Sequence, residues 1–109
     1  TLDAFMAHIL HAVNVSGEDH VGISSDSPIL GFDTGPESMA QWNAINEERQ
    51  RLGVAAPGEG PPPYIVGTNG PSRMPKIREE LLRRGIKSAA ADKIMGQNFA
   101  RVFKSAWPV

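Results

Sequence analysis

The stretch His20-Val-Gly-Ile-Ser-Ser-Asp26 decides the fold that the sequence predicts. Its apolar residues, Val21 and Ile23, alternate with small residues, and a period of two is typical of a β-strand with two different faces. Small side chains on the face that Asp26 shares would leave space for a ligand. In α/β barrels, residues at the carboxyl end of a strand lie at the catalytic face. We therefore expect Asp26 to be a catalytic residue that also contacts the substrate.

Helical periodicity flanks this stretch on both sides. Apolar residues three and four positions apart predict a helix from the N-cap Thr1 to Ser16-Gly17. Further helices are predicted over 37–52 and 72–84, and a last helix is predicted between Ser88 and Pro108. Between the second and third helices, ten of the nineteen residues from 53 to 71 are glycine or proline, which predicts a long loop.

A single strand beside four helices is an incomplete set, because both of its edges would lack hydrogen-bond partners. The order helix, strand, long loop and helices is typical of the closing segment of an alternating β/α array. The chain also opens with Thr1 inside a predicted helix, without an initiator methionine. We therefore expect a piece of a larger α/β domain, whose other strands belong to further polypeptide.

Composition narrows the function classes. The 11 basic and 12 acidic residues nearly balance, so a nucleic-acid partner is not expected. The absence of cysteine excludes disulfides and thiolate zinc sites. No run approaches the roughly 20 apolar residues that a membrane span needs, and no signal peptide opens the chain. These features predict a soluble protein and leave its compartment open.

Three segments resemble the membrane (renal) dipeptidase family, which is zinc-dependent. The run from His8 to Asp26 is similar to that family's H-x-x-H helix and the VGxGxD strand that follows it. Residues 74–85 are similar to its P-x-I-x-x-E-L-L-R-R-G segment, and residues 94–103 to its G-x-N-x-x-R-V-F segment. The resemblance covers about residues 2–26 and 73–107, in the same order.

The resemblance implies a fold and a chemistry. The family fold is a (β/α)8 TIM-type barrel of the metal-dependent hydrolase kind, of which this chain would be the C-terminal segment, with the last strand and the surrounding helices. Residues 1–109 would then be the C-terminal part of a single barrel domain, with 27–71 as a long inserted loop that carries one helix. The N-terminal remainder of the barrel is the implied partner, and a homodimer is compatible with the family.

The family hydrolyses dipeptides, often with a D-residue at the C-terminal side, by a water that bridges two zinc ions. The family's zinc ligands lie on earlier strands, so the two expected ions have no ligands in this chain. Asp26 corresponds to the carboxylate that relays a proton between this water and the leaving amine. A zinc-bound water has a pKa near 7, so a nearby carboxylate can receive its proton.

Two departures leave other functions open. One is the loop between the two matching parts of the chain, which is longer than is common in the family, and the other follows Asp26. The family continues its strand with D-F-D-G, whereas this chain has Asp26-Ser-Pro-Ile, and a Phe32-Asp33 pair occurs only later, before Gly35. A dipeptidase-like barrel without peptidase activity, with a binding or tailoring role, is therefore an alternative. A small helical interaction module is another. Asp33 is the alternative catalytic carboxylate, and Asp26 could instead cap a turn or pair with a surface cation.

Other residues have simpler explanations. The spacing of His8 and His11 on one helix, with His20 nearby, could hold a metal ion, but no acidic residue completes the set, so helix-surface roles are expected. The two last helices around Gly85 resemble a helix-turn-helix, which the acidic Glu79 disfavours. Packing is expected for Trp42, Tyr64 and Trp107, and Trp42 or Tyr64 could instead line the mouth of a pocket. Three arginines are expected at helix ends or in solvent: Arg83, Arg84 and Arg101.

Overall fold

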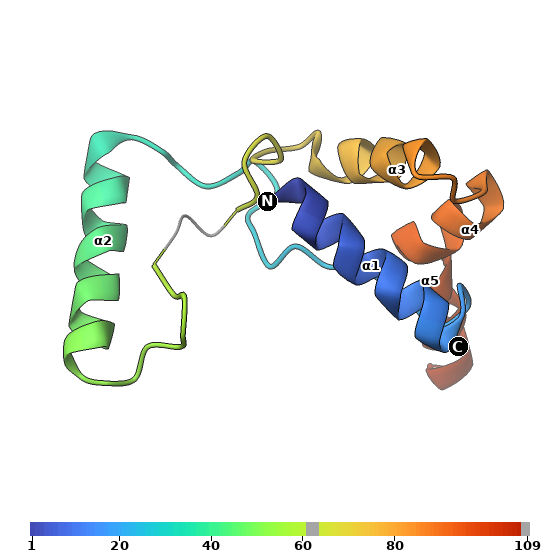
Figure 1. The fold of residues 1–109 in the computed structure, drawn as a ribbon, viewed down its shortest axis with the longest axis horizontal. Helices are drawn as coiled ribbons and strands as arrows, with labels where there is room; N and C mark the ends of the chain where they lie inside the picture. Colours follow the sequence, from blue (N-terminus) through green and yellow to red (C-terminus); the bar gives the residue numbers. More distant parts are fainter. Residues whose placement is uncertain (61–63, 108–109) are drawn as a thin grey trace.

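A computed structural model describes residues 1–60 and 64–107 (Figure 1). One end of the molecule holds most of the helices, and α2 stands apart at the other end (Figure 1). Within the described ranges no residue belongs to a β-strand. The elements, in chain order, are α1 (Leu2–Ser16), α2 (Pro36–Arg51), α3 (Arg73–Arg83), α4 (Ser88–Asp92), the π-helical turn η1 (Lys93–Gln97) and α5 (Asn98–Ala106).

The predicted α/β fold class, the C-terminal segment of a (β/α)8 TIM-type barrel, is therefore wrong for this structure. The stretch 20–26 connects α1 to α2 without forming a strand. Its apolar alternation has another cause: Val21 is buried and Ile23 packs against the helical core. The Val21 carbonyl accepts a hydrogen bond from the Asn98 side chain at 2.8 Å. A side-chain amide thus takes the place of a neighbouring strand.

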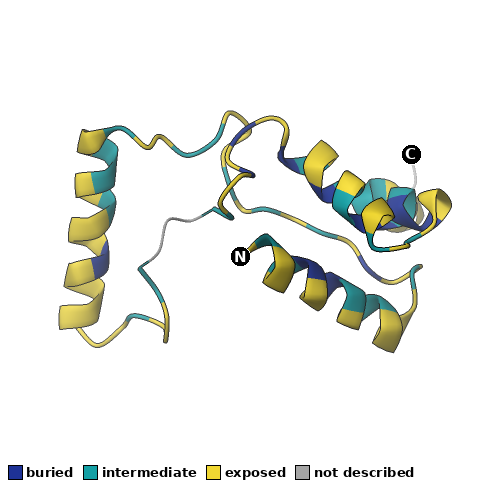
Figure 2. Cartoon of the chain, turned by 45° about the horizontal axis from the view of Figure 1, so that its top comes forward, coloured by how far each residue is buried: buried dark blue, intermediate teal, exposed yellow. Residues whose placement is uncertain are grey.

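The core lies where α1, α3 and η1 meet. Met6 and Ile9 of α1 are buried with Ile77 and Leu81 of α3 and with Ile94 of η1. Buried residues accordingly lie on the facing sides of α1 and α3 (Figure 2). Each fully buried apolar side chain of this size contributes roughly 1.5–3 kcal/mol to folding. This cluster therefore fixes α3 against α1.

The first helix follows its predicted boundaries. The Thr1 side chain accepts a hydrogen bond from the Ala4 amide at 3.2 Å, as its N-cap role predicts. Gly17 follows the last helical residue with a φ of 83°, a conformation that favours glycine. The third predicted helix is also present, but Ser72 makes no side-chain cap.

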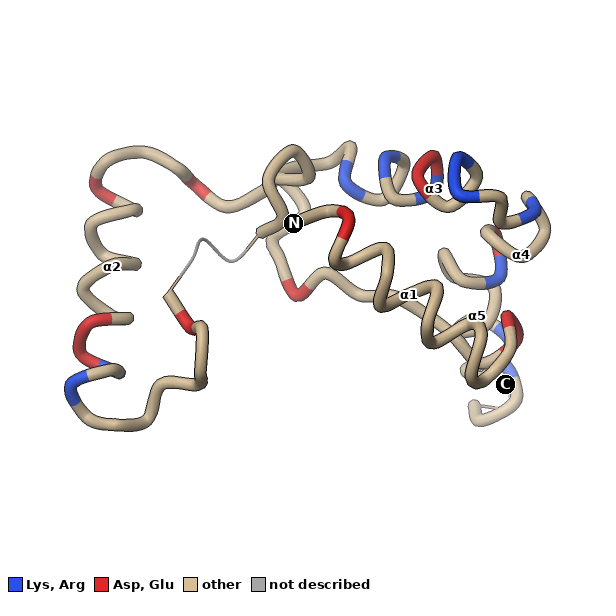
Figure 3. The backbone as a smooth tube through the Cα atoms, in the orientation of Figure 1, with Lys and Arg blue, Asp and Glu red and all other residues tan. Residues whose placement is uncertain are grey.

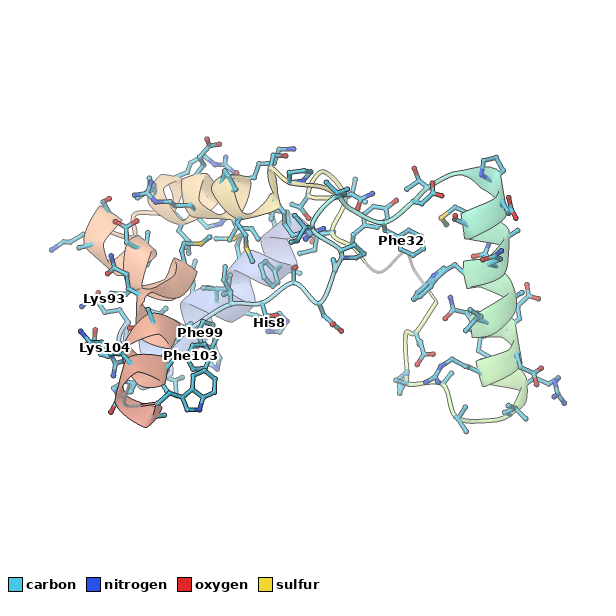
Figure 4. The ribbon with its side chains drawn as sticks, turned by 180° about the vertical axis from the view of Figure 1, so that it is seen from behind. His8, Phe32, Lys93, Phe99, Phe103 and Lys104 are labelled. Carbon is cyan, nitrogen blue, oxygen red and sulfur yellow. The ribbon has the colours of Figure 1, made fainter. Side chains whose placement is uncertain are left out.

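The last predicted helix is broken. Gly96 has non-helical dihedral angles, and α5 leaves the direction of α4 there. The apolar stripe is divided as a result: Ile94 is buried, whereas Phe99 and Phe103 remain 42% and 48% exposed. Their rings lie on one side of α5 (Figure 4) and stack at 6.1 Å between centroids, and Trp107 stacks on Phe103 at 4.9 Å. We call Phe99, Phe103 and Trp107 the aromatic ladder.

The helix predicted in the long connection is α2, followed by Gly53 with a φ of 70°. Phe32 points toward α2 (Figure 4), and the edge of Trp42 contacts it with 5.5 Å between ring centroids. Glu59 forms an ion pair with Arg49, which holds the returning segment against the helix. The predicted loop over 53–71 includes Pro61–Pro63, which lie outside the described residues.

The molecule exposes more surface than a compact domain of its size. Its radius of gyration is 16.7 Å, against about 13 Å for a compact chain of this length. Its accessible surface is 7633 Å², against about 5,900 Å² for a folded monomer of this mass. The surplus is roughly 1,700 Å², and both α2 and α5 carry large apolar residues that are exposed. Among the helices described, none has the length and apolarity to cross a bilayer.

Candidate functional site beside the buried Arg73

Arg73, the first residue of α3, is a buried cation. Only 7% of it is exposed, although arginine is seldom this buried without a carboxylate partner. Its Nε donates to the Thr68 carbonyl at 2.9 Å, Nη1 to the Ser25 hydroxyl at 3.1 Å, and Nη2 to the Pro28 carbonyl at 3.3 Å. All three acceptors are neutral. In the described part of the chain its guanidinium forms no ion pair, so its charge is not compensated.

A cavity of about 300 Å³ adjoins this guanidinium. Its walls combine apolar groups with hydroxyls, and the guanidinium is the one charged group among them. The lining residues are Phe5, Ile65 and Ile77, then Ser24, Ser25, Ser27, Tyr64 and Thr68, together with Arg73. A guanidinium has five N–H groups, of which three are used here, so two remain for a ligand. This arrangement suits a small anion that carries an apolar substituent.

Asp26 lies in the turn that Arg73 holds. Two of the three hydrogen bonds from the guanidinium reach Ser25 and Pro28, which flank Asp26 on either side. The Ser27 hydroxyl closes the turn by donating to the Ser25 carbonyl at 3.0 Å. Asp26 has a φ of 46°, which makes it the one non-glycine residue with positive φ in the described ranges. Its carboxylate is exposed and does not line the cavity, whose wall includes the residues on both sides of it.

The left-handed conformation of Asp26 is a local strain. It costs an L-residue roughly 1–2 kcal/mol, although aspartate and asparagine tolerate it better than most. Such strained residues persist where surrounding contacts fix them, and they cluster at functional sites. The Arg73 contacts are the fixing contacts here. The structure thus holds Asp26 in a defined, solvent-facing position beside a cationic cavity.

Asp33 has a different environment. One of its carboxylate oxygens accepts from the Gly35 amide at 2.8 Å, and the other accepts from the Ser38 hydroxyl at 2.6 Å. These hydrogen bonds, the one from Ser38 first, hold the pKa of Asp33 below its ordinary value. Asp33 therefore organises the start of α2, and both of its oxygens are already engaged.

The histidines are not gathered into a metal site. His8, His11 and His20 are exposed, and His20 Nδ1 lies 2.9 Å from the Ser16 carbonyl oxygen. Among residues 1–60 and 64–107, no three His, Cys, Asp or Glu side chains are grouped to hold a metal ion. The described residues therefore do not fit zinc.

The other aromatic residues and arginines considered in the sequence have varied surroundings. Tyr64 lines the cavity, whereas Trp42 donates to the Gly60 carbonyl at 3.3 Å and Trp107 is 69% exposed. Arg83 and Arg84 form ion pairs with Glu80. Acidic and basic residues are interspersed along α3 in this way (Figure 3).

Two residues of the 94–103 segment, Asn98 and Arg101, hold the backbone at the start of the 20–26 stretch. Asn98, which is 6% exposed, donates to the Glu18 carbonyl at 2.7 Å as well as to Val21. Arg101 donates to the Asp19 carbonyl. Lys93 also pairs with the Asp19 carboxylate at 2.8 Å and lowers its pKa. In the sequence, Asn98 is only the asparagine of the G-x-N-x-x-R-V-F segment, and that pattern does not predict this role.

Comparison with known proteins finds a distant similarity to a dipeptidase. The chain is 28% identical over 104 residues to Dipeptidase tcpJ of Claviceps purpurea (strain 20.1). The match includes 95% of this chain and 17% of that protein, so the chain spans about a sixth of the length of the relative. No family model and no solved structure matches. The similarity is consistent with a dipeptidase-like fragment, and it does not assign the chain to a family.

Proposed function

We propose that this chain is part of a protein that hydrolyses dipeptides, and that Asp26 is its proton-transfer residue. The observation that carries the proposal is the similarity of nearly the whole chain to part of a dipeptidase. Dipeptide hydrolysis adds water across one peptide bond and gives a free carboxylate and a free amine. A group near the reacting atoms must take a proton from the water and give one to the amine nitrogen.

The local geometry supports this role for Asp26. Its carboxylate faces solvent, and in the described ranges no hydrogen bond or ion pair engages it, so it is available to a substrate. The turn that carries it is fixed by Arg73 on both sides. Positioned proton transfer of this kind typically accelerates a reaction about 100- to 10,000-fold. Asp33 is less suitable because both of its oxygens already accept hydrogen bonds.

Two zinc ions belong to the proposal only as ions held outside this chain. The described histidines and carboxylates do not form a metal site, so the role of Asp26 is derived without them. Metal analysis of the protein that carries this chain, together with loss of activity on chelation and recovery with zinc, tests this element. Recovery with no added metal would contradict it.

The chain is proposed to act together with further polypeptide. It matches only 17% of the length of its relative, and it exposes roughly 1,700 Å² more surface than a compact monomer. A stable protein interface of standard size buries about 800 Å² on each partner, so the surplus is more than one such interface would cover on this chain. The aromatic ladder of α5 is an exposed apolar patch that such a partner could cover.

A binding role without hydrolysis is the second candidate. The exposed aromatic ladder favours it, because aromatic residues are enriched in protein interfaces. The two candidates differ in their products. We expect the protein that carries this chain to release free amino acids from Ala-Ala and Gly-Ala, and to leave Ala-Ala-Ala intact. No amino-acid release from either dipeptide, with zinc supplied, would reject the peptidase and leave the binding role.

A further inference from the structure

The cavity beside Arg73 has the chemistry of a carboxylate site. We infer that it binds the C-terminal carboxylate of a small peptide, with the adjoining side chain against the apolar wall. The inference rests on the proposed function for the identity of the ligand. It deepens that function because neither the sequence motifs nor the similarity to a dipeptidase singles out Arg73.

The first argument is charge. Arg73 as a residue is only 7% exposed, and the three hydrogen-bond acceptors of its guanidinium are all neutral. A buried charge is costly unless it is paired, so the site favours an anion over a neutral molecule. A carboxylate matches the fork geometry of a guanidinium and would meet the two remaining N–H groups.

The second argument is shape. A cavity of about 300 Å³ lies at the lower end of the range for small-molecule sites, which suits an amino-acid residue better than a long peptide. Phe5, Ile65 and Ile77 provide an apolar wall for a small side chain. The Tyr64 and Ser24 side chains lie on the same cavity and are placed to contact polar atoms of the ligand.

The third argument is position. Arg73 donates to the Ser25 hydroxyl on one side of Asp26 and to the Pro28 carbonyl on the other, so a carboxylate on the guanidinium would lie near the turn that carries the proposed proton-transfer residue. Anchoring one end of a peptide beside such a residue orients the rest of it, and orientation is a large part of catalytic power. The same arginine would therefore fix both the substrate and the turn.

Direct binding to the 109-residue chain is the test. N-acetylalanine and N-acetylalaninamide differ only in the carboxylate, and each is titrated while amide NMR resonances of Ser25, Thr68 and Arg73 are followed. We expect saturable shifts with the acid and none with the amide. Equal shifts with the two compounds would overturn the inference, as would tighter binding of inorganic phosphate than of the acid.

Variants locate the site. Arg73→Lys keeps the charge but loses the fork, and it should weaken binding of the acid roughly ten- to a hundredfold. Arg51→Gln, which changes an exposed arginine of α2, is the control and should bind like the parent. Equal weakening in both variants would contradict the assignment.

A second pair of variants leaves Arg73 intact in case its replacement unfolds the chain. Ser24 is exposed and lines the cavity, so Ser24→Asp adds a carboxylate there, and Ser24→Asn adds a neutral group of the same shape. We expect Ser24→Asp to weaken binding at least about tenfold relative to Ser24→Asn. Equal affinity of the two would overturn the inference.

Binding and hydrolysis fail separately in this design. Discrimination of acid from amide without any hydrolysis by the protein that carries the chain would reject the proposed peptidase and keep the anion site. Hydrolysis of dipeptides without such discrimination would keep the peptidase and reject the site at Arg73.

Discussion

Replacing Asn98 tests how the helical core holds the 20–26 stretch. Asn98 is 6% exposed, and its Nδ2 donates to two backbone carbonyls, those of Glu18 at 2.7 Å and Val21 at 2.8 Å. Each hydrogen bond contributes about 1 kcal/mol net, and a buried carbonyl left without a donor costs about 1–3 kcal/mol. Asn98→Ala should therefore lower the free energy of unfolding by about 2–4 kcal/mol.

Asn46→Ala is the matched control. Asn46 is equally buried at 6% exposed, but its Nδ2 makes one hydrogen bond, to the Trp42 carbonyl one turn earlier in α2. That carbonyl keeps its helical partner in the variant, and alanine is the better helix former by roughly 0.7 kcal/mol. The control should therefore change the free energy of unfolding by less than about 1 kcal/mol.

Urea unfolding followed by far-ultraviolet circular dichroism measures both variants. With an m-value of about 1.5 kcal/mol per molar, Asn98→Ala should lower the midpoint by roughly 1.3 M or more, and the control should lower it by less than half of that. Equal midpoints for the two variants would refute the reasoning, because they would show that Asn98 does not hold the 20–26 stretch in place.

Three further predictions concern α5 and its surroundings. A Cβ at Gly22 would lie 2.7 Å from Cζ of Phe99, so Gly22→Ala should cost about 1–3 kcal/mol, and less when combined with Phe99→Ala, as a double-mutant cycle of unfolding energies will show if the clash is the cause. The hydrogen bond from Lys93 lowers the pKa of Asp19 from 3.8, so this pair stabilises the fold above about pH 4, and its contribution is lost as the pH falls below that value. Lys93→Gln should therefore make Tm depend less on pH in the acid range, and an unchanged dependence of Tm on pH would contradict this. An exposed apolar patch favours association, so the chain is expected to self-associate through the aromatic ladder in sedimentation at high concentration. Phe103 is 48% exposed, so Phe103→Ser should reduce that association while changing stability by less than about 1 kcal/mol; undiminished association would exclude the ladder as its cause.

Local signals in the sequence predict the helices well. Thr1 caps the start of α1 as predicted, and Gly17 ends it at the predicted place with a positive φ, although its ψ of 156° is not that of a left-handed helical cap. The boundaries of α2 and α3 agree with their predictions to within one residue at each end. These elements depend on neighbours three or four residues away, which a periodic pattern records.

The error over 20–26 has a physical cause. The alternation of Val21 and Ile23 predicts that one face of the segment is buried, but it does not predict which groups form hydrogen bonds with the backbone amides and carbonyls. Here the Asn98 side chain, 77 residues away from Val21, donates to its carbonyl in place of a strand. No local pattern records an interaction over that distance.

Arg73 was not predicted for the same reason. It looks like an ordinary first-turn arginine, and its burial depends on two loops that fold over it, one of which is separated from it by 45–48 residues. Gly96 similarly interrupts an apolar stripe that reads as one continuous helix. The sequence therefore predicted a role for Asp26, which stays a prediction, but it did not predict Arg73, which holds the turn around Asp26.

The most direct test of the account is the kcat for Ala-Ala of two variants of the protein that carries this chain. Asparagine tolerates the left-handed backbone of residue 26, so Asp26→Asn removes the proton-transfer group with little change in the turn. We predict that kcat falls about 100- to 10,000-fold in Asp26→Asn and less than about threefold in Asp33→Asn. Full activity in Asp26→Asn would contradict the central claim.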